Sequence, residues 1–244
     1  MKVIAVIPAR YGSTRFPGKP LVKIKDKTLI EWVIAGSKTS KYLNEIIVAT
    51  DDERILSVAK NAGVKAVMTS EKCATGTDRI FEATKDIDFD VVINIQGDEP
   101  QINSKYIDPL VEAFINQKNL DMATLAHPIE FKDLENKNAV KVIKNMNDEA
   151  IYFSRFAIPF SRVEASCEAN DASTVTLKHI GLYGYSKSFL QKFCEAPQAD
   201  IEKYESLEQL RALHLGAKIK VITVDQPIQG VDTPEDMKIV EKYL

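Results

Sequence analysis

Short apolar runs alternate with amphipathic segments along most of this chain, and this alternation limits its possible folds more than any other feature. Val3–Ile7 is a continuous, largely β-branched run, which is typical of a strand buried on both faces of a sheet. Leu29–Ser37 instead spaces its apolar residues as a helix does. Strands that alternate with helices in this way predict βαβ units, and therefore an α/β fold with a mostly parallel sheet.

The same pattern predicts the order of the elements. The expected strands are Val3–Ile7, Glu45–Thr50, Lys65–Thr69, Asp90–Gln96, Met122–Ala126, Ala139–Ile143, His179–Tyr185 and Lys218–Val224. The expected helices are Leu29–Ser37, Asp52–Ala62, Thr77–Thr84, Ser104–Gln117, Lys187–Cys194, Ser206–Leu215 and Pro234–Tyr243. No linker divides the chain, so we expect one domain over 1–244, with an excursion around 129–170 where polar residues and Pro159 loosen the pattern.

Composition removes several classes of protein. The chain has 244 residues, 45% of them apolar, and 32 Lys+Arg against 35 Asp+Glu give a net charge of −3. This balance argues against disorder and against nucleic acid as a partner. No run approaches about 18 apolar residues, so we expect no membrane partner, and the opening apolar run is too short for a signal peptide. Three widely spaced cysteines without a C-x-x-C pair predict a reducing, cytoplasmic location.

The segment after the first strand, Pro8–Leu21, concentrates three cations within ten residues. Arg10, Arg15 and Lys19 are interleaved there with glycines and small hydroxyls. Open α/β sheets bind ligands at this edge, and glycine N–H groups with fixed cations suit the oxygens of a triphosphate. The alternative is a solvated basic loop. The loop matches neither G-x-x-x-x-G-K-[ST] nor G-x-G-x-x-G, which argues against a P-loop protein and against a nicotinamide dehydrogenase.

Two acids follow apolar segments far apart in the chain. Asp98 follows Gly97 after the strand at Asp90–Gln96, and Asp232 follows the last strand. Two such carboxylates could share one Mg²⁺, with substrate phosphate completing its shell. The alternatives are a turn-forming role for Asp98 and helix capping by Asp232.

A polar loop, 69–79, opens the helix expected at Thr77–Thr84. Its hydroxyls and the helix N-terminus could hold a base or a ribose, although capping by Thr75 or Thr77 accounts for them equally well. Cys73 in this loop has no nearby His, which argues against a cysteine nucleophile.

Further polar residues lie in the second half of the chain. Arg155 and Arg162 could bind a carboxylate bidentately. His179 could donate a hydrogen bond to a sugar hydroxyl, although a lone His is more often structural. Glu208–Arg211 lies on an expected helix, where a solvated face is the alternative.

Taken in order, these segments resemble the 3-deoxy-manno-octulosonate cytidylyltransferases, also called CMP-Kdo synthetases. The resemblance spans nearly the whole chain, and its later segments favour the Kdo branch over other sugar cytidylyltransferases. The matching segments are Ile7–Arg10, Ser13–Leu21, Ala49–Asp51, Gly76–Arg79, Gln96–Pro100, Met122–Leu125, Asn138–Val142, Tyr152–Arg155, His179–Tyr185, Leu207–Arg211 and Gly230–Asp236.

The resemblance implies a three-layer nucleotide-diphospho-sugar transferase-like (Rossmann-like) fold, with a mostly parallel mixed sheet and an inserted dimerisation lobe. It implies a homodimer and the Mg²⁺-dependent reaction CTP + Kdo → CMP-Kdo + diphosphate, which activates the sugar for lipopolysaccharide biosynthesis. The catalytic residues that it implies are Lys19, Asp98 and Asp232, with Asp98 and Asp232 as the metal ligands. The CTP contacts that it implies are Arg10, Ser13, Arg15, Lys19, Thr77 and Asp78. The Kdo contacts that it implies are Gln96, Arg155, Arg162, His179, Tyr183, Glu208 and Gln209.

Other functions stay open at this point. The chain departs from related sequences at 73–75 and at 160–161, which leaves 8-amino-Kdo as an alternative substrate. A sialic-acid cytidylyltransferase is the nearest enzyme of another substrate class. A nucleotide-binding module without catalysis is disfavoured by Lys19, Asp98 and Asp232.

Overall fold

The computed structural model describes residues 1–12, 16–160 and 175–244. Three residues for which the sequence predicts substrate contacts, Ser13, Arg15 and Arg162, lie outside these ranges. None of the helices in the described ranges is both long and apolar enough to cross a membrane.

One mixed sheet forms the centre of the fold, with β1 (Val3–Ala9) between β4 (Glu45–Thr50) and β6 (Val91–Asn94). The strand order is β11-β7-β10-β6-β1-β4-β5. β1 pairs in parallel with both neighbours, whereas β10 (Leu177–Ser186) runs antiparallel to β6 and β7. The other strands along this order are β5 (Lys65–Met68), β7 (Met122–Pro128) and β11 (Ile219–Thr223). The mostly parallel mixed sheet is confirmed.

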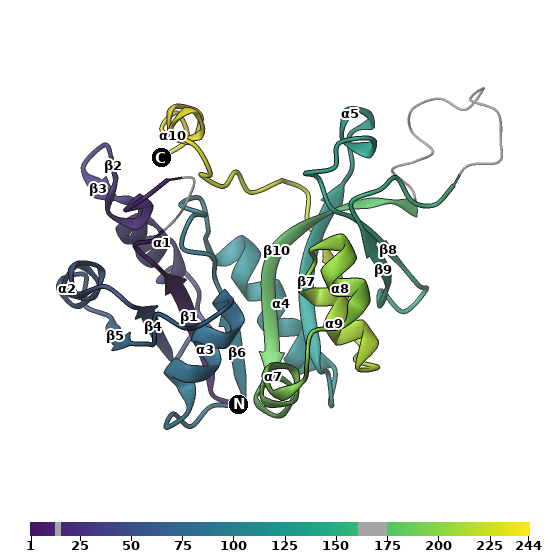
Figure 1. Cartoon of the computed structure of the whole chain (residues 1–244), viewed down its shortest axis with the longest axis horizontal. Coiled ribbons are helices and arrows are strands. Elements are labelled where there is room, and N and C mark those ends of the chain that lie inside the picture. The colour runs from purple at the N-terminus through teal and green to yellow at the C-terminus, as the bar shows by residue number, and fades with distance from the viewer. Residues whose placement is uncertain (13–15, 161–174) are drawn as a thin grey trace.

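Helices cover both faces of this sheet, and the apolar run of β1 explains why. Its side chains are buried on both faces, and alternate residues enter two separate apolar clusters. The first cluster includes α1 (Leu29–Ser37), α2 (Glu53–Asn61) and α4 (Ser104–Asn116). The second includes α3 (Gly76–Thr84), α7 (Lys187–Glu195) and α9 (Gln209–His214). The result is the expected three-layer α/β arrangement (Figure 1).

Helix starts are set by local side-chain bonds. Thr28 with Glu31, Thr75 with Asp78 and Thr233 with Asp236 each form a capping box, in which the two side chains satisfy each other's backbone N–H groups. The first of these boxes begins α1, the second α3 and the third α10 (Pro234–Val240). A Cβ at Gly76 would lie 3.3 Å from Pro8 Cγ, so the start of α3 packs against the end of β1, at the carboxyl edge of the sheet.

Several short elements are absent from the sequence-based prediction. They are η1 (Lys19–Leu21), the hairpin of β2 (Lys23–Ile24) and β3 (Lys27–Thr28), α5 (Phe131–Leu134), β9 (Ala150–Ser154) and α8 (Asp200–Glu205). Each has six residues or fewer, too few to show a period. The helix predicted over 206–215 begins at Gln209, because Ser206 has a left-handed backbone (φ 52°) between α8 and α9.

The excursion leaves the sheet after β7 and returns at β10. Within it β8 (Lys141–Lys144) and β9 form a hairpin, and β8 also pairs with the beginning of β10. Lys141 is completely buried, and its ammonium donates to the carbonyls of Asn136, Ala139 and Arg155. Figure 1 shows the hairpin beside α8 and α9, at the end of the molecule opposite β5.

Candidate active site

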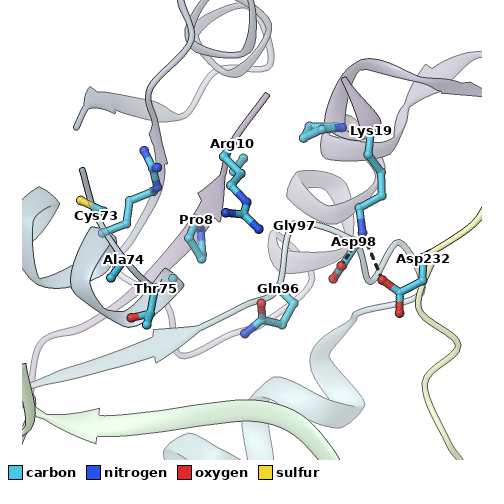
Figure 2. A pocket seen from close by; sticks show the side chains of 14 residues that line it. Pro8, Arg10, Lys19, Cys73, Ala74, Thr75, Gln96, Gly97, Asp98 and Asp232 are labelled. Carbon is cyan, nitrogen blue, oxygen red and sulfur yellow. Dashed lines mark hydrogen bonds and ion pairs between the residues drawn. The ribbon is translucent and has the colours of Figure 1, made fainter. Parts of the chain in front are cut away.

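A pocket lies at the carboxyl ends of β1 and β6, where the segments that follow these neighbouring strands meet (Figure 2). Five residues that the sequence predicts for the site line this pocket: Arg10, Lys19, Gln96, Asp98 and Asp232. Residues 73–76, which lead into α3, form another part of its wall. The pocket therefore joins a cationic loop, two acids and a helix N-terminus.

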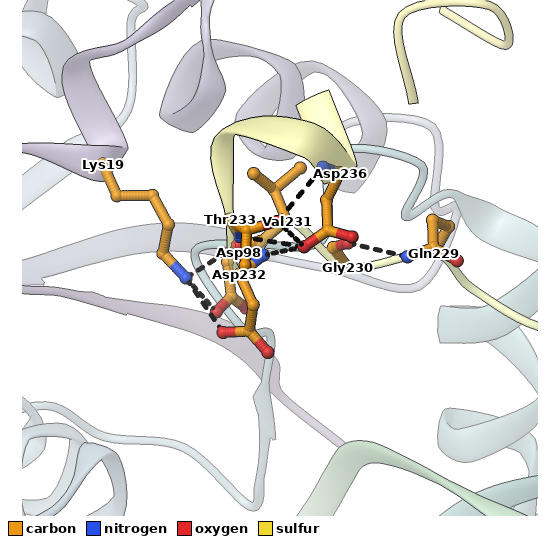
Figure 3. A network of polar contacts seen from close by, with 8 residues as sticks. All are labelled: Lys19, Asp98, Gln229, Gly230, Val231, Asp232, Thr233 and Asp236. Atoms are coloured by element: carbon orange, nitrogen blue, oxygen red, sulfur yellow. Dashed lines mark hydrogen bonds and ion pairs between the residues drawn. The ribbon is translucent and has the colours of Figure 1, made fainter. Parts of the chain in front are cut away.

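The ammonium of Lys19 lies between two carboxylates (Figure 3). Lys19 Nζ is 2.7 Å from Asp98 Oδ2 and 3.6 Å from Asp232 Oδ1. It also donates to the carbonyl of Val231 at 2.8 Å. Lys19 follows Gly18, whose positive φ of 70° makes the turn into η1 that most other residues would resist. Three distant parts of the chain thus meet at one cation.

Close backbone contacts hold the two acids in place. A Cβ at Gly97 would lie 3.0 Å from the carbonyl oxygen of Pro8, so glycine lets the turn before Asp98 press against the end of β1. The Val231 N–H donates to the carbonyl of Asp98 at 2.9 Å, which ties the C-terminal segment to that turn. Figure 1 shows this segment, coloured yellow, leading to α10.

The capping box at the start of α10 does not include Asp232. Thr233 accepts from the Asp236 N–H, and the Asp236 side chain accepts from the Thr233 N–H. The capping box is therefore made by Thr233 and Asp236, while an oxygen of Asp232 faces Lys19 (Figure 3).

A buried guanidinium forms the wall of the pocket near α3. Arg79 donates to Asp51 Oδ2 at 2.7 Å and to Thr69 Oγ1 at 2.6 Å. Asp51 also accepts from the backbone N–H of Tyr11 at 3.4 Å, which links this wall to the cationic loop. Neither Arg79 nor Asp51 is among the site residues expected from the sequence. They could have been found from the sequence, because Asp51 directly follows a strand and Arg79 lies in a segment of the family resemblance.

Thr77 and Asp78 do not line the pocket. Asp78 Oδ2 accepts from the Thr75 N–H in the capping box of α3, so capping accounts for its contact. Thr77 is buried and donates to Glu208 Oε2 at 2.8 Å. The structure therefore joins Thr77 to the residues predicted to bind the sugar.

Two of the residues predicted to bind the sugar have a buried polar atom with no hydrogen-bond partner within the described ranges. These atoms are Glu208 Oε1 and Gln209 Nε2. Burial raises the pKa of Glu208, although hydrogen bonds from Thr77 and Thr75 oppose the shift. Buried polar groups are nearly always paired. An unpaired acceptor on one residue and an unpaired donor on the next indicate a place for a polar ligand.

Gln96 connects the pocket with β10. Its amide donates to the carbonyl of Gly181 at 3.4 Å. His179 and Tyr183 lie on either side of Gly181 along β10, and their rings are 5.4 Å apart. Burial lowers the pKa of His179 to about 3, and burial with the nearby Glu208 raises that of Tyr183. Both side chains are uncharged near pH 7, and neither lines the pocket itself.

Arg155 contacts backbone groups rather than the pocket. Its guanidinium donates to the carbonyls of Glu205, Ser206 and Lys137, at 2.8, 3.3 and 3.1 Å respectively. The Glu205 carboxylate in turn accepts from the Arg155 backbone N–H. Arg155 therefore holds the chain that leads into Glu208, which is a different contact from the sugar carboxylate predicted for it.

Two other titratable groups near the pocket are uncharged at neutral pH. Burial and the charge of Asp98 raise the pKa of Glu99 to about 8. Burial and the adjacent Glu82 raise the pKa of the Cys73 thiol to about 11, so Cys73 is a poor nucleophile although it lines the pocket.

A cationic loop and two acids at the carboxyl edge of a mixed α/β sheet are suited to nucleotidyl transfer, and the comparisons with known proteins place the chain in that class. Residues 4–219 match the family model described as cytidylyltransferase. The chain is 57% identical to the 3-deoxy-manno-octulosonate cytidylyltransferase of Bdellovibrio bacteriovorus, over 100% of this chain and 98% of that protein. It is 45% identical to the 8-amino-3,8-dideoxy-manno-octulosonate cytidylyltransferase of Shewanella pealeana, over 100% of this chain and 99% of that protein.

A solved structure agrees with these matches. The structure of CMP:2-keto-3-deoxy-manno-octonic acid synthetase complexed with CTP superimposes with a TM-score of 0.93 at 37% identity, covering 100% of this chain and 98% of that one. The chain therefore belongs to the cytidylyltransferase family, and within it to the 3-deoxy-manno-octulosonate cytidylyltransferases.

Proposed function

We propose that this enzyme transfers the cytidylyl group of CTP to Kdo and releases diphosphate, using the pocket between Arg10 and Asp232. The observation that carries the proposal is the placement of Lys19 between Asp98 and Asp232 at the sheet edge. The nucleotide would lie between this cluster and residues 73–76. The sugar would lie beyond Gln96, toward the unpaired atoms of Glu208 and Gln209. The product is an activated sugar for lipopolysaccharide biosynthesis.

The residues present fit a Mg²⁺ ion. The carboxylates of Asp98 and Asp232 already share one cationic group, the Lys19 ammonium. Within the described ranges no group of three or more His, Cys, Asp or Glu side chains could hold a metal. Two carboxylates completed by phosphate oxygens and water are a donor set that Mg²⁺ accepts. When bound, the ion would supply charge neutralisation at the α-phosphate and lower the pKa of the attacking hydroxyl.

The protein groups act by positioning and by charge. The anomeric oxygen of Kdo forms a bond to the α-phosphorus while the bond from that phosphorus to the β-phosphate oxygen breaks and diphosphate leaves. Such transfers need little covalent help from the protein. Arg10 and Lys19 stabilise the charge that develops on the leaving diphosphate. Gln96, fixed between the pocket and β10, orients the sugar beside the nucleotide.

We include a homodimer and a cytoplasmic location in the proposal. Large apolar side chains are exposed in the excursion, among them Phe131 at 71% and Ile151 at 55%. Exposed apolar surface of this kind supports an interface with a second copy of the chain. In the described ranges Cys73 and Cys194 are free thiols, which supports a reducing compartment.

A substrate panel tests the proposal. Diphosphate release from CTP and Mg²⁺ is measured separately with Kdo, 8-amino-Kdo and sialic acid, and without a sugar. The expected result is the highest kcat/KM with Kdo and no release without a sugar. A higher kcat/KM with 8-amino-Kdo or with sialic acid would assign the enzyme to that sugar instead. If no sugar gives diphosphate release, the chain would instead be a nucleotide-binding module without catalysis.

A further inference from the structure

Thr124 on β7 points at an irregularity in β10. Ile180 pairs with Leu125, and the next pair is Tyr183 with Thr124. Two residues of β10, Gly181 and Leu182, are therefore extra relative to β7, and they form a bulge. Bulges redirect side chains and backbone groups next to active sites. This one brings two β10 carbonyls and the ring of His179 around a single hydroxyl.

That hydroxyl has three neighbours within hydrogen-bond distance. Thr124 Oγ1 is 2.9 Å from His179 Nε2, 3.2 Å from the Ile180 carbonyl and 2.9 Å from the Leu182 carbonyl. It is fully buried, so no other partner competes for it. A hydroxyl has one hydrogen to donate and two lone pairs that accept, whereas a carbonyl only accepts.

These valences fix the direction of each bond. If the Thr124 hydrogen pointed at His179 Nε2, two carbonyl oxygens would face the hydroxyl oxygen with no hydrogen between them. The hydrogen therefore goes to the carbonyls, and Thr124 Oγ1 accepts from a hydrogen on Nε2. Because burial lowers the pKa of His179 to about 3, the ring carries only this one hydrogen near pH 7. The other ring nitrogen, Nδ1, then has an open lone pair.

We propose that Thr124 is a positioning residue that holds His179 in its Nε2–H tautomer, so that Nδ1 accepts a hydrogen bond from a hydroxyl group of the sugar substrate. The ring is also held in orientation by Phe153, edge-on at 5.1 Å, and by Tyr183. Within the described ranges Nδ1 has no hydrogen-bond partner. The proposal makes His179 an acceptor toward the sugar, whereas the sequence analysis considers it as a donor. The assignment of the ligand as a sugar rests on the proposed function, whereas the tautomer does not.

The tautomer is measured in the free enzyme by NMR of ¹⁵N-histidine-labelled protein. The chain has only three histidines, and the signals of His179 are identified by their loss in His179→Asn. Long-range ¹H–¹⁵N spectra are expected to show Nε2 as the protonated nitrogen and Nδ1 as the unprotonated one. In Thr124→Val the two nitrogens should shift toward averaged values, and Thr124→Ser should restore the wild-type spectrum.

The kinetic readout separates the two substrates. Thr124→Val should raise KM for Kdo about tenfold, the size of one lost hydrogen bond, and leave KM for CTP within about twofold. Thr124→Ser should stay near wild type. Thr84→Val is the matched control, because Thr84 is also buried and its hydroxyl donates to carbonyls, those of Ile80 and Phe81 in its own helix, rather than bonding to a histidine. It should change neither the spectrum nor KM for Kdo.

Two results would overturn the proposal: a wild-type His179 protonated at Nδ1, or a Thr124→Val variant with an unchanged His179 spectrum and unchanged KM for Kdo. An enzyme that shows the Nε2–H tautomer but no turnover of Kdo would instead contradict the proposed function. The spectrum therefore tests the tautomer of His179, and the substrate panel separately tests the proposed function.

Discussion

At the scale of single residues, the sugar end of the site combines buried charge with unpaired atoms, and this combination has a cost in stability. Glu208 illustrates it, because burial raises its pKa above the usual 4.5. The folded protein then binds the Glu208 proton more tightly than the unfolded chain does. The stability associated with that proton is present below about pH 4.5 and is lost as pH rises through the raised pKa.

Glu208→Gln should therefore make the protein more stable and weaken its binding of Kdo. The neutral amide does not ionise, so the variant does not lose stability as Glu208 does when the pH rises. Its free energy of unfolding relative to wild type should therefore increase from pH 4.5 to pH 8. Its KM for Kdo should rise about tenfold or more, as for a lost bond to a charged group. Urea unfolding at the two pH values, with the exposed Glu195→Gln as control, checks this. An equal stability difference at both pH values would refute it.

Residue types and their positions along the chain predict part of this site. Lys19, Asp98 and Asp232 can be placed at one sheet edge from sequence because each follows a strand or begins a turn. The partners of Thr77 and Arg155 cannot, because their contacts depend on how α3, α8 and α9 pack. Arg79 is missed for the same reason, since its partner Asp51 lies on another strand end.

At the scale of elements, long periodic segments are predictable and short ones are not. The continuous apolar run of β1 and the apolar spacing of the amphipathic helices are each enough to predict the element. The hairpin of β8 and β9 has a weaker sequence pattern, since β9 is a five-residue strand that, among the described strands, pairs only with β8. The bulge in β10 has no sequence signal beyond Gly181, because it exists only relative to β7.

The excursion that contains this hairpin leads to a prediction about assembly. Exposed Phe131 and Ile151 should be covered by a second copy, so light scattering should give twice the mass of the chain. Phe131→Asp and Ile151→Asp should each shift the enzyme toward the monomer without unfolding it, since both side chains are exposed. Tyr243→Asp, equally exposed but on the C-terminal side of α10, should not. A monomeric wild-type enzyme would contradict the proposed dimer.

At the scale of the whole molecule, the sheet topology brings distant parts of the chain to one place. The loop after β1, the turn after β6 and the segment after β11 meet at Lys19, Asp98 and Asp232. The near-neutral net charge gives no hint of this convergence. The order of the strands, and the insertion of β10 antiparallel between β6 and β7, cannot be read from the alternation of elements, yet they decide which loops face one another.

We propose that the cluster of Lys19, Asp98 and Asp232 carries the transfer of the cytidylyl group to Kdo. The most direct test of this proposal is diphosphate release from CTP and Kdo at saturating Mg²⁺ by wild type and by Asp98→Asn. The variant keeps the size of the side chain and loses its charge, so kcat should fall about 10²–10³-fold. A kcat within about twofold of wild type would contradict the account.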